Sequence, residues 1–183
     1  MANEYNLLKC LSHPNIVRMV CFKSNLNLLV LEYCSVVWNE KEIHNLEEWA
    51  KCFNDRSSSV DCSIMKQIAS GLEYLHTREK LHCDLKPSNC LLTGEAGCPW
   101  IKLSDFGLAF NQSATASGTK HTKIGTKEIG TMLYKAPEAC QASQDWRTKE
   151  NDIYAFGFLA VEMLFPERTS AYGSPLLDVG NIM

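Results

Sequence analysis

A short polar stretch near the middle of the chain carries side chains suited to phosphate chemistry. Residues 81–89 read L-H-C-D-L-K-P-S-N, which places the carboxylate of Asp84, the ammonium group of Lys86 and the amide of Asn89 close together. A carboxylate can orient the proton of a hydroxyl, an ammonium group can neutralise a phosphate, and oxygen-bearing side chains suit magnesium. Each residue alone is more often a solvated loop residue, so the interpretation depends on their joint spacing.

Two further motifs follow this stretch. Asp105-Phe106-Gly107 comes after an apolar run, and Ala136-Pro137-Glu138 lies further downstream. Any one short motif could arise by chance, but three in this order are improbable as an accident. Together they resemble the catalytic loop (H-R-D-L-K-x-x-N), the magnesium-binding motif and the end of the activation segment in the eukaryotic protein kinase family. The resemblance covers nearly the whole chain.

The resemblance implies a role for each polar residue. Asp84 would orient the attacking hydroxyl and Lys86 would lie near the transferred phosphate, while Asn89 and Asp105 would hold Mg²⁺. Lys86 and the pair Gly130-Thr131 are similar to serine/threonine kinases, in which the Thr131 hydroxyl would bridge Asp84 and Lys86. ATP with Mg²⁺ is the implied cofactor, and a serine or threonine of a protein substrate is the implied acceptor.

The resemblance also assigns residues around the nucleotide. The backbone of Glu32 and Cys34 would contact adenine, Leu31 would be the gatekeeper residue beside them, and Leu91 would pack under the adenine ring. The simpler interpretation of the apolar residues is core packing, and both can hold at once.

Further positions match structural or regulatory residues of the family. Glu138 closes the activation segment, and Glu4 matches the paired glutamate of the family's αC helix, although alone it would be a surface carboxylate. Asp152 would accept hydrogen bonds from the catalytic-loop backbone, or would be an ordinary helix N-cap. Four residues match the family's regulatory hydrophobic stack, namely Leu8, Met19, His82 and Phe106.

The elements that must position these residues follow from hydrophobic spacing. Ile64, Ile68, Leu72 and Leu75 mark one face of an amphipathic helix, and residues 90–92 and 100–103 read as a hairpin. We also expect helices at 4–11 and 46–52, strands at 16–22 and 28–31, a long loop at 111–131, and a core helix at 152–165 that is apolar nearly all round.

The predicted fold is the α+β, two-lobed protein-kinase fold. The domain prediction is a small-lobe remnant and hinge at 1–34 (αC helix, two strands, hinge), a mainly helical large lobe at 35–168 that ends after its core helix, and an irregular tail at 169–183. No glycine-rich loop or V-A-I-K lysine precedes Glu4 in this sequence, and the chain resembles a kinase domain truncated at both ends. We therefore expect exposed apolar surface and weak or no activity from residues 1–183 in isolation.

Composition narrows the remaining possibilities. A net charge of −3 gives no basic surface for nucleic acid, and no apolar run is long enough for a membrane span. Nine cysteines, an odd number without C-x-x-C spacing, indicate reduced thiols in a cytoplasmic protein. Cys83 replaces the arginine of H-R-D and cannot pair with a phosphorylated loop residue, so we expect phosphatase treatment to leave the rate of the full-length enzyme nearly unchanged.

Two other functions compete with an active protein kinase. The absent glycine-rich loop and lysine favour a non-catalytic, pseudokinase-like scaffold, whereas the presence of Asp84, Lys86, Asn89 and Asp105 favours an enzyme. A phosphotransferase for small molecules would share part of the pattern, but the segment around Ala136-Pro137-Glu138 and Thr131 resembles a peptide-docking surface.

Overall fold

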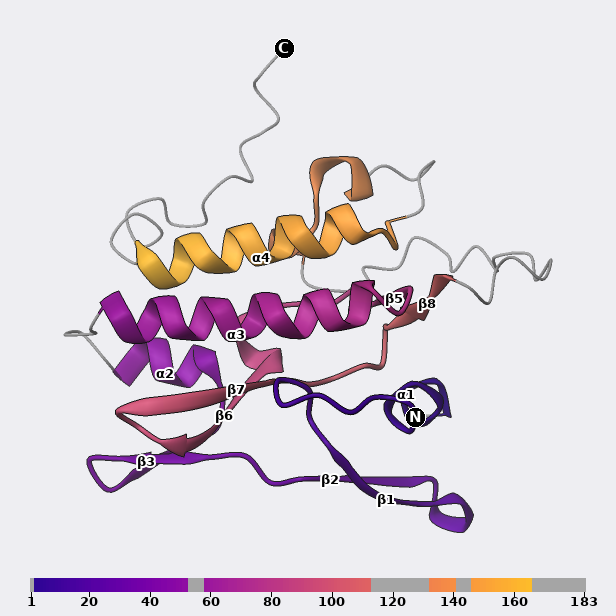
Figure 1. Cartoon of the computed structure of the whole chain (residues 1–183), viewed down its shortest axis with the longest axis horizontal. Helices are drawn as coiled ribbons and strands as arrows, with labels where there is room; N and C mark the ends of the chain where they lie inside the picture. Colours follow the sequence, from indigo (N-terminus) through magenta and orange to yellow (C-terminus); the bar gives the residue numbers. More distant parts are fainter. Residues whose placement is uncertain (1, 53–57, 113–131, 141–145, 166–183) are drawn as a thin grey trace.

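The structure is a computed structural model that describes residues 2–52, 58–112, 132–140 and 146–165 (Figure 1). Its helices are α1 (Ala2–Leu8), α2 (Leu46–Cys52), α3 (Ser58–His76) and α4 (Lys149–Leu164). Its strands are β1 (Met19–Lys23), β2 (Leu28–Leu31), β3 (Val36–Trp38), β4 (Lys41–Ile43), β5 (Lys80–Leu81), β6 (Cys90–Glu95), β7 (Cys98–Leu103) and β8 (Phe110–Asn111). Among these described helices, none is long and apolar enough to cross a membrane.

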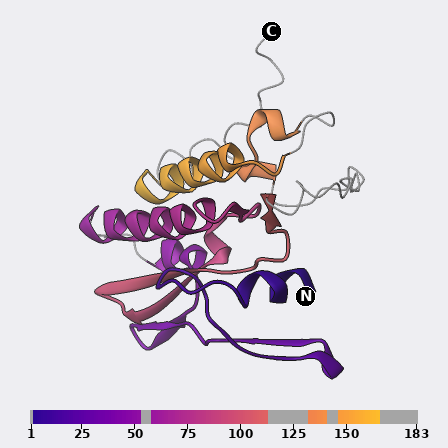
Figure 2. The ribbon, with the colours of Figure 1, turned by 45° about the vertical axis from the view of Figure 1, so that its right-hand side comes forward.

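The N-terminal part combines one helix with one hairpin. β1 and β2 pair antiparallel from Met19 opposite Leu31 to Lys23 opposite Leu28. α1 lies over this hairpin, where the rings of Tyr5 and Phe22 stack at 4.4 Å (Figure 2). This arrangement is the small lobe that the sequence predicts, and it continues from β2 directly into the hinge, residues 32–34.

The large lobe is organised around α3, which lies between α4 and the β6–β7 hairpin (Figure 1). The predicted apolar face of α3 is confirmed, because Ile64, Ile68, Leu72 and Leu75 are all buried. Burying such a continuous stripe is the main source of stability for an amphipathic helix.

The β6–β7 hairpin has the predicted position, with Cys90 opposite Leu103 and Glu95 opposite Cys98. Its buried residues alternate along each strand, so one face covers α3. The hairpin connects the end of the catalytic loop to Asp105, and its register therefore sets the distance between the two motifs.

Two strand expectations need correction. The strand expected at 16–22 begins only at Met19, because Val17 donates to the Leu103 carbonyl and Leu103 donates to the Asn15 carbonyl. Residues 15–17 thus bond to the end of β7 rather than to β2. The hairpin β3–β4 was not expected, although Asn39 and Glu40 form its turn with φ of 47° and 62°.

The core helix also differs from its prediction. α4 begins at Lys149 rather than at 152, and Thr148 is its N-cap, accepting a hydrogen bond from the Asn151 N–H. The helix is not buried all round, since Ile153 and Val161 are 59% and 44% exposed. The mixture of helices and small antiparallel sheets nevertheless confirms the α+β class. The loop expected at 111–131 lies, beyond Gln112, outside the described residues.

Candidate active site

The catalytic-loop motif lies between β5 and a 3₁₀ turn, η2 (Pro87–Asn89). The ammonium group of Lys86 is 2.9 Å from Oδ2 of Asp84, and the two side chains are 25% and 9% exposed. A partly buried, hydrogen-bonded pair of this kind holds both side chains in one geometry. The structure therefore brings together the predicted proton acceptor and the predicted phosphate-binding cation.

Asn89 is bonded to the same aspartate. Its Nδ2 donates to the Asp84 carbonyl at 2.8 Å and to Asp84 Oδ2 at 3.1 Å. Because the amide nitrogen is used in this way, the amide oxygen of Asn89 is the atom available to a cation. This orientation fits the oxygen ligand that magnesium requires.

Ser104 links the loop to the second motif. Its N–H and its hydroxyl both donate to the Asn89 carbonyl, at 2.9 and 3.0 Å. The next residue, Asp105, has an exposed side chain and a left-handed backbone with φ of 59°. Ser104 thus joins the segments that carry Asn89 and Asp105, whose amide and carboxylate oxygens are of the kind that Mg²⁺ prefers, and their role as its ligands stays a prediction.

His82 is a neutral structural residue of the site. It is fully buried, and this burial lowers its pKa below the ordinary value, although Asp152 and Asp84 oppose the shift. Its Nε2 is 3.0 Å from the Ser104 carbonyl, which can only accept, so Nε2 carries the proton. Its ring lies 5.1 Å from that of Phe106, as expected for two members of the predicted stack.

The other two members of the predicted stack lie nearby. Leu8 is buried in the same hydrophobic cluster as Phe106, and Met19 packs against this cluster while remaining partly exposed. Glu4 of α1 reaches the same region, close to Phe106 and to the charge of Asp105. Burial and the nearby charge of Asp105 raise the pKa of Glu4.

Asp152 contacts the catalytic loop from α4. Its Oδ2 accepts from the His82 N–H at 2.9 Å, and its Oδ1 accepts from the Cys83 N–H at 2.8 Å. His76 Nε2 also lies 2.9 Å from Oδ2. Cys83 has φ of 66°, an unfavourable conformation for a residue with a Cβ, and these hydrogen bonds compensate for it. Asp152 was expected either to bond to the catalytic-loop backbone or to be the N-cap of its helix. The structure shows the bonds to the loop, and the N-cap is Thr148.

The hinge residues lie at the end of β2. The Glu32 N–H already donates to the Arg18 carbonyl at 2.9 Å, so Glu32 can offer adenine only its carbonyl. Cys34 is buried, while Leu31 and Leu91 are partly buried and pack against the core. Core packing is therefore present for these apolar residues, and contact with adenine stays a prediction.

Two predicted residues are not brought into the site by the described structure. Thr131 lies outside the described residues, and Glu138 is exposed on the 3₁₀ turn η5 (Pro137–Cys140).

Sequence reasoning also missed two contacts of the activation-segment end. The Ala136 N–H donates to Asn151 Oδ1 at 2.9 Å, and Tyr134 Oη donates to Glu162 Oε2 at 2.5 Å. The available signal was Glu162 itself, a charge within the otherwise largely apolar stretch of residues 153–165.

The sequence of the chain is similar to those of known protein kinases. The model of the protein kinase domain family matches residues 1–174. A G-type lectin S-receptor-like serine/threonine-protein kinase of Arabidopsis thaliana is 34% identical over 180 residues, which cover 93% of this chain and 20% of the relative. The mitogen-activated protein kinase mpk-1 of Caenorhabditis elegans is 32% identical over 182 residues, which cover 98% of this chain and 38% of the relative. The chain thus spans well under half the length of these relatives.

Proposed function

Because the chain belongs to the protein kinase domain family, we propose that it is the catalytic region of a serine/threonine kinase that transfers the γ-phosphate of ATP to a protein hydroxyl. The observation that carries the proposal is the bonded group of Asp84, Lys86 and Asn89, which Ser104 connects to Asp105. Phosphoryl transfer depends on positioning and charge neutralisation, and this group supplies both.

Each residue has a defined task in this proposal. The carboxylate of Asp84 accepts or orients the proton of the substrate hydroxyl, and Lys86 offsets the charge of the transferred group. Asn89 and Asp105 would hold Mg²⁺, which when bound would neutralise negative charge on the phosphates. Thr131 would help to position Asp84 and Lys86 when substrate binds.

The hinge and the neighbouring apolar residues complete the nucleotide site. The Glu32 carbonyl and the Cys34 backbone would bond to the adenine edge, while Leu31 and Leu91 would bound the ring. The stack of Leu8, Met19, His82 and Phe106 would align the two lobes, with Glu4 and Glu138 as further structural residues. Eight of the nine cysteines are free thiols, which supports action in the reducing cytoplasm.

A phosphotransfer assay tests the proposal. The full-length protein that carries these residues is incubated with γ-labelled ATP, Mg²⁺ and a peptide library that contains serine, threonine and tyrosine. We expect label on serine or threonine, and a rate reduced roughly 10²–10⁴-fold by Asp84→Asn or Asp105→Ala. Glu73→Gln, an exposed change on α3, is the matched control and should retain the wild-type rate.

The outcomes separate the competing functions. Label on tyrosine alone would contradict the serine/threonine assignment. Transfer that survives Asp84→Asn would contradict the proposed site, and a complete absence of transfer would favour the non-catalytic scaffold. The scaffold is not favoured at present, because Asp84, Lys86 and Asn89 are bonded together and Ser104 links Asn89 to the segment of Asp105.

A further inference from the structure

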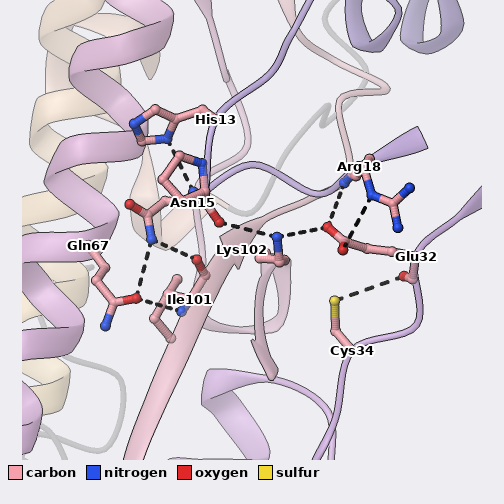
Figure 3. A network of polar contacts seen from close by, with 9 residues as sticks. His13, Asn15, Arg18, Glu32, Cys34, Gln67, Ile101 and Lys102 are labelled. Atoms are coloured by element: carbon pink, nitrogen blue, oxygen red, sulfur yellow. Dashed lines mark hydrogen bonds and ion pairs between the residues drawn. The ribbon is translucent and has the colours of Figure 1, made fainter. Parts of the chain in front are cut away.

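Lys102 forms an ion pair that none of the sequence motifs predicts. It lies on β7, three residues before Asp105, and its Nζ is 2.9 Å from Oε1 of Glu32 in the hinge (Figure 3). The same ammonium group donates to the Pro14 carbonyl at 3.2 Å. The two side chains are only 17% and 18% exposed, so solvent screens this pair far less than a typical surface salt bridge.

Glu32 is restrained by more than this lysine. Its Oε1 accepts from the Arg18 N–H at 2.8 Å, and its own N–H donates to the Arg18 carbonyl at 2.9 Å. The Arg18 guanidinium adds little, because it is 3.9 Å away and 71% exposed. Burial alone would raise the pKa of Glu32, but the hydrogen bonds from Lys102 and Arg18 outweigh it and lower that pKa. The side chain is therefore a carboxylate at neutral pH.

The Glu32 carbonyl is the group left for a ligand. Within the described part of the chain, its hydrogen-bond contact is a long one from the Cys34 thiol, at 3.9 Å. Burial, and secondly the charge of Glu32, raise the pKa of this thiol, so it is a weak neutral donor. A fixed acceptor with so weak a partner can accept a stronger hydrogen bond from an adenine amino group.

The segment that carries the Pro14 carbonyl is held in place by several hydrogen bonds. Asn15, beside the Pro14 carbonyl, is buried and donates to Gln67 Oε1 and to the Ile101 carbonyl at 3.2 and 3.0 Å (Figure 3). Gln67 Oε1 also accepts from the Ile101 N–H at 2.9 Å. These bonds tie the segment before β1 to α3 and β7, so Lys102 joins the hinge to a structure that does not move freely.

We propose that Lys102 is a positioning residue of the nucleotide site, which holds Glu32 so that the hinge carbonyl is oriented for adenine before the nucleotide binds. This inference rests on the proposed kinase function. A hinge that is already restrained loses less conformational entropy when the nucleotide binds. The ion pair should therefore affect nucleotide affinity rather than the rate of the chemical step.

The test compares three lysine variants of the full-length protein. Lys102→Met removes the charge and keeps the length, Lys102→Arg keeps the charge, and Lys66→Met is the control on an exposed part of α3. The dissociation constant of a fluorescent ATP analogue, the KM for ATP and the kcat are measured. Lys102→Met should raise the first two about three- to tenfold and leave kcat within about twofold. Lys102→Arg should restore affinity, and Lys66→Met should change nothing.

A second variant and a second readout keep the test decisive. Glu32→Gln should weaken nucleotide binding as Lys102→Met does, and the double variant should be no weaker than either single variant. Amide hydrogen exchange at residues 28–34, without nucleotide, should accelerate in both. Unchanged affinity and exchange, or tighter binding, would overturn the proposal. If the wild type binds no nucleotide, the kinase function fails, and hinge exchange alone decides whether Lys102 holds Glu32.

Discussion

The carboxylate of Asp152 lies inside the large lobe with 1% of the residue exposed, and two backbone donors and one imidazole reach it. A buried charge is costly unless its hydrogen bonds are complete. Here the donors come from α3 and from the catalytic loop, so a single side chain determines where both His82 and Cys83 lie. Its removal should therefore disturb stability and catalysis together.

Asp152→Asn should lower the free energy of unfolding by about 2–4 kcal/mol, because an amide has one acceptor oxygen where the carboxylate has two. Urea denaturation measures the loss, and the phosphotransfer rate should fall in parallel. Glu150→Gln, an exposed change in the same helical turn, is the control. A stability equal to that of the control would contradict the role assigned to Asp152.

The buried imidazole of His82 predicts a pH dependence. Its pKa is lowered in the folded protein, so the unfolded chain takes up the proton first, near pH 6.5. The free energy of unfolding should thus decrease as pH falls through this value, by up to about 1.4 kcal/mol per pH unit for one group. Denaturation between pH 7.5 and 5.5 measures the slope.

The variant His82→Gln should reduce this slope, because its amide can donate the same hydrogen bond to the Ser104 carbonyl without titrating. A smaller slope will remain, since the pKa of His13 is lowered in the same direction by burial. An identical slope in wild type and variant would show that His82 is not the group responsible.

At the scale of elements, the contact between α3 and β7 depends on a glycine. A Cβ at Gly71 would lie 2.8 Å from Leu103 Cδ1 and 3.1 Å from the Asn15 carbonyl oxygen. Leu103 is fully buried and cannot move aside cheaply. The close approach of helix and strand therefore requires the absence of a side chain at this position.

Gly71→Ala should destabilise the protein by about 1–3 kcal/mol, although alanine is the better helix former. Gly157→Ala in α4 is the matched control, because a Cβ there meets no atom of the described residues within 4 Å. This second change should stabilise the protein by up to about 1 kcal/mol. Thermal denaturation of both variants gives the comparison, and a stabilising Gly71→Ala would refute the packing argument.

At the scale of the whole molecule, α4 leaves an apolar face in solvent. Ile153, Val161, Leu164 and Phe165 are between 37% and 59% exposed. Large contiguous apolar patches are uncommon on soluble monomers and promote association. The exposed surface that the sequence analysis expected is thus present, and it lies on the helix that was expected to be buried.

The double variant Ile153→Lys/Val161→Glu should raise the concentration at which the chain begins to associate, because it interrupts this face with charge. Light scattering across a concentration series measures the effect. Val37→Lys, on the distant strand β3 and 66% exposed, should have a smaller effect. Equal effects of the two changes would show that association does not depend on α4.

The sequence motifs alone were enough to predict which residues form the candidate site. Residues 81–89 lie close together along the chain, so their spacing limits where their side chains can lie, and Asp105 follows in a second recognisable motif. The period of α3 and the β6–β7 hairpin could be predicted for the same reason: local geometry repeats along the chain. The tertiary structure alone decided the contacts between distant segments, such as Lys102 with Glu32 and Asp152 with His82. It also decided which face of α4 is exposed, because burial depends on what packs against a helix and not on its composition.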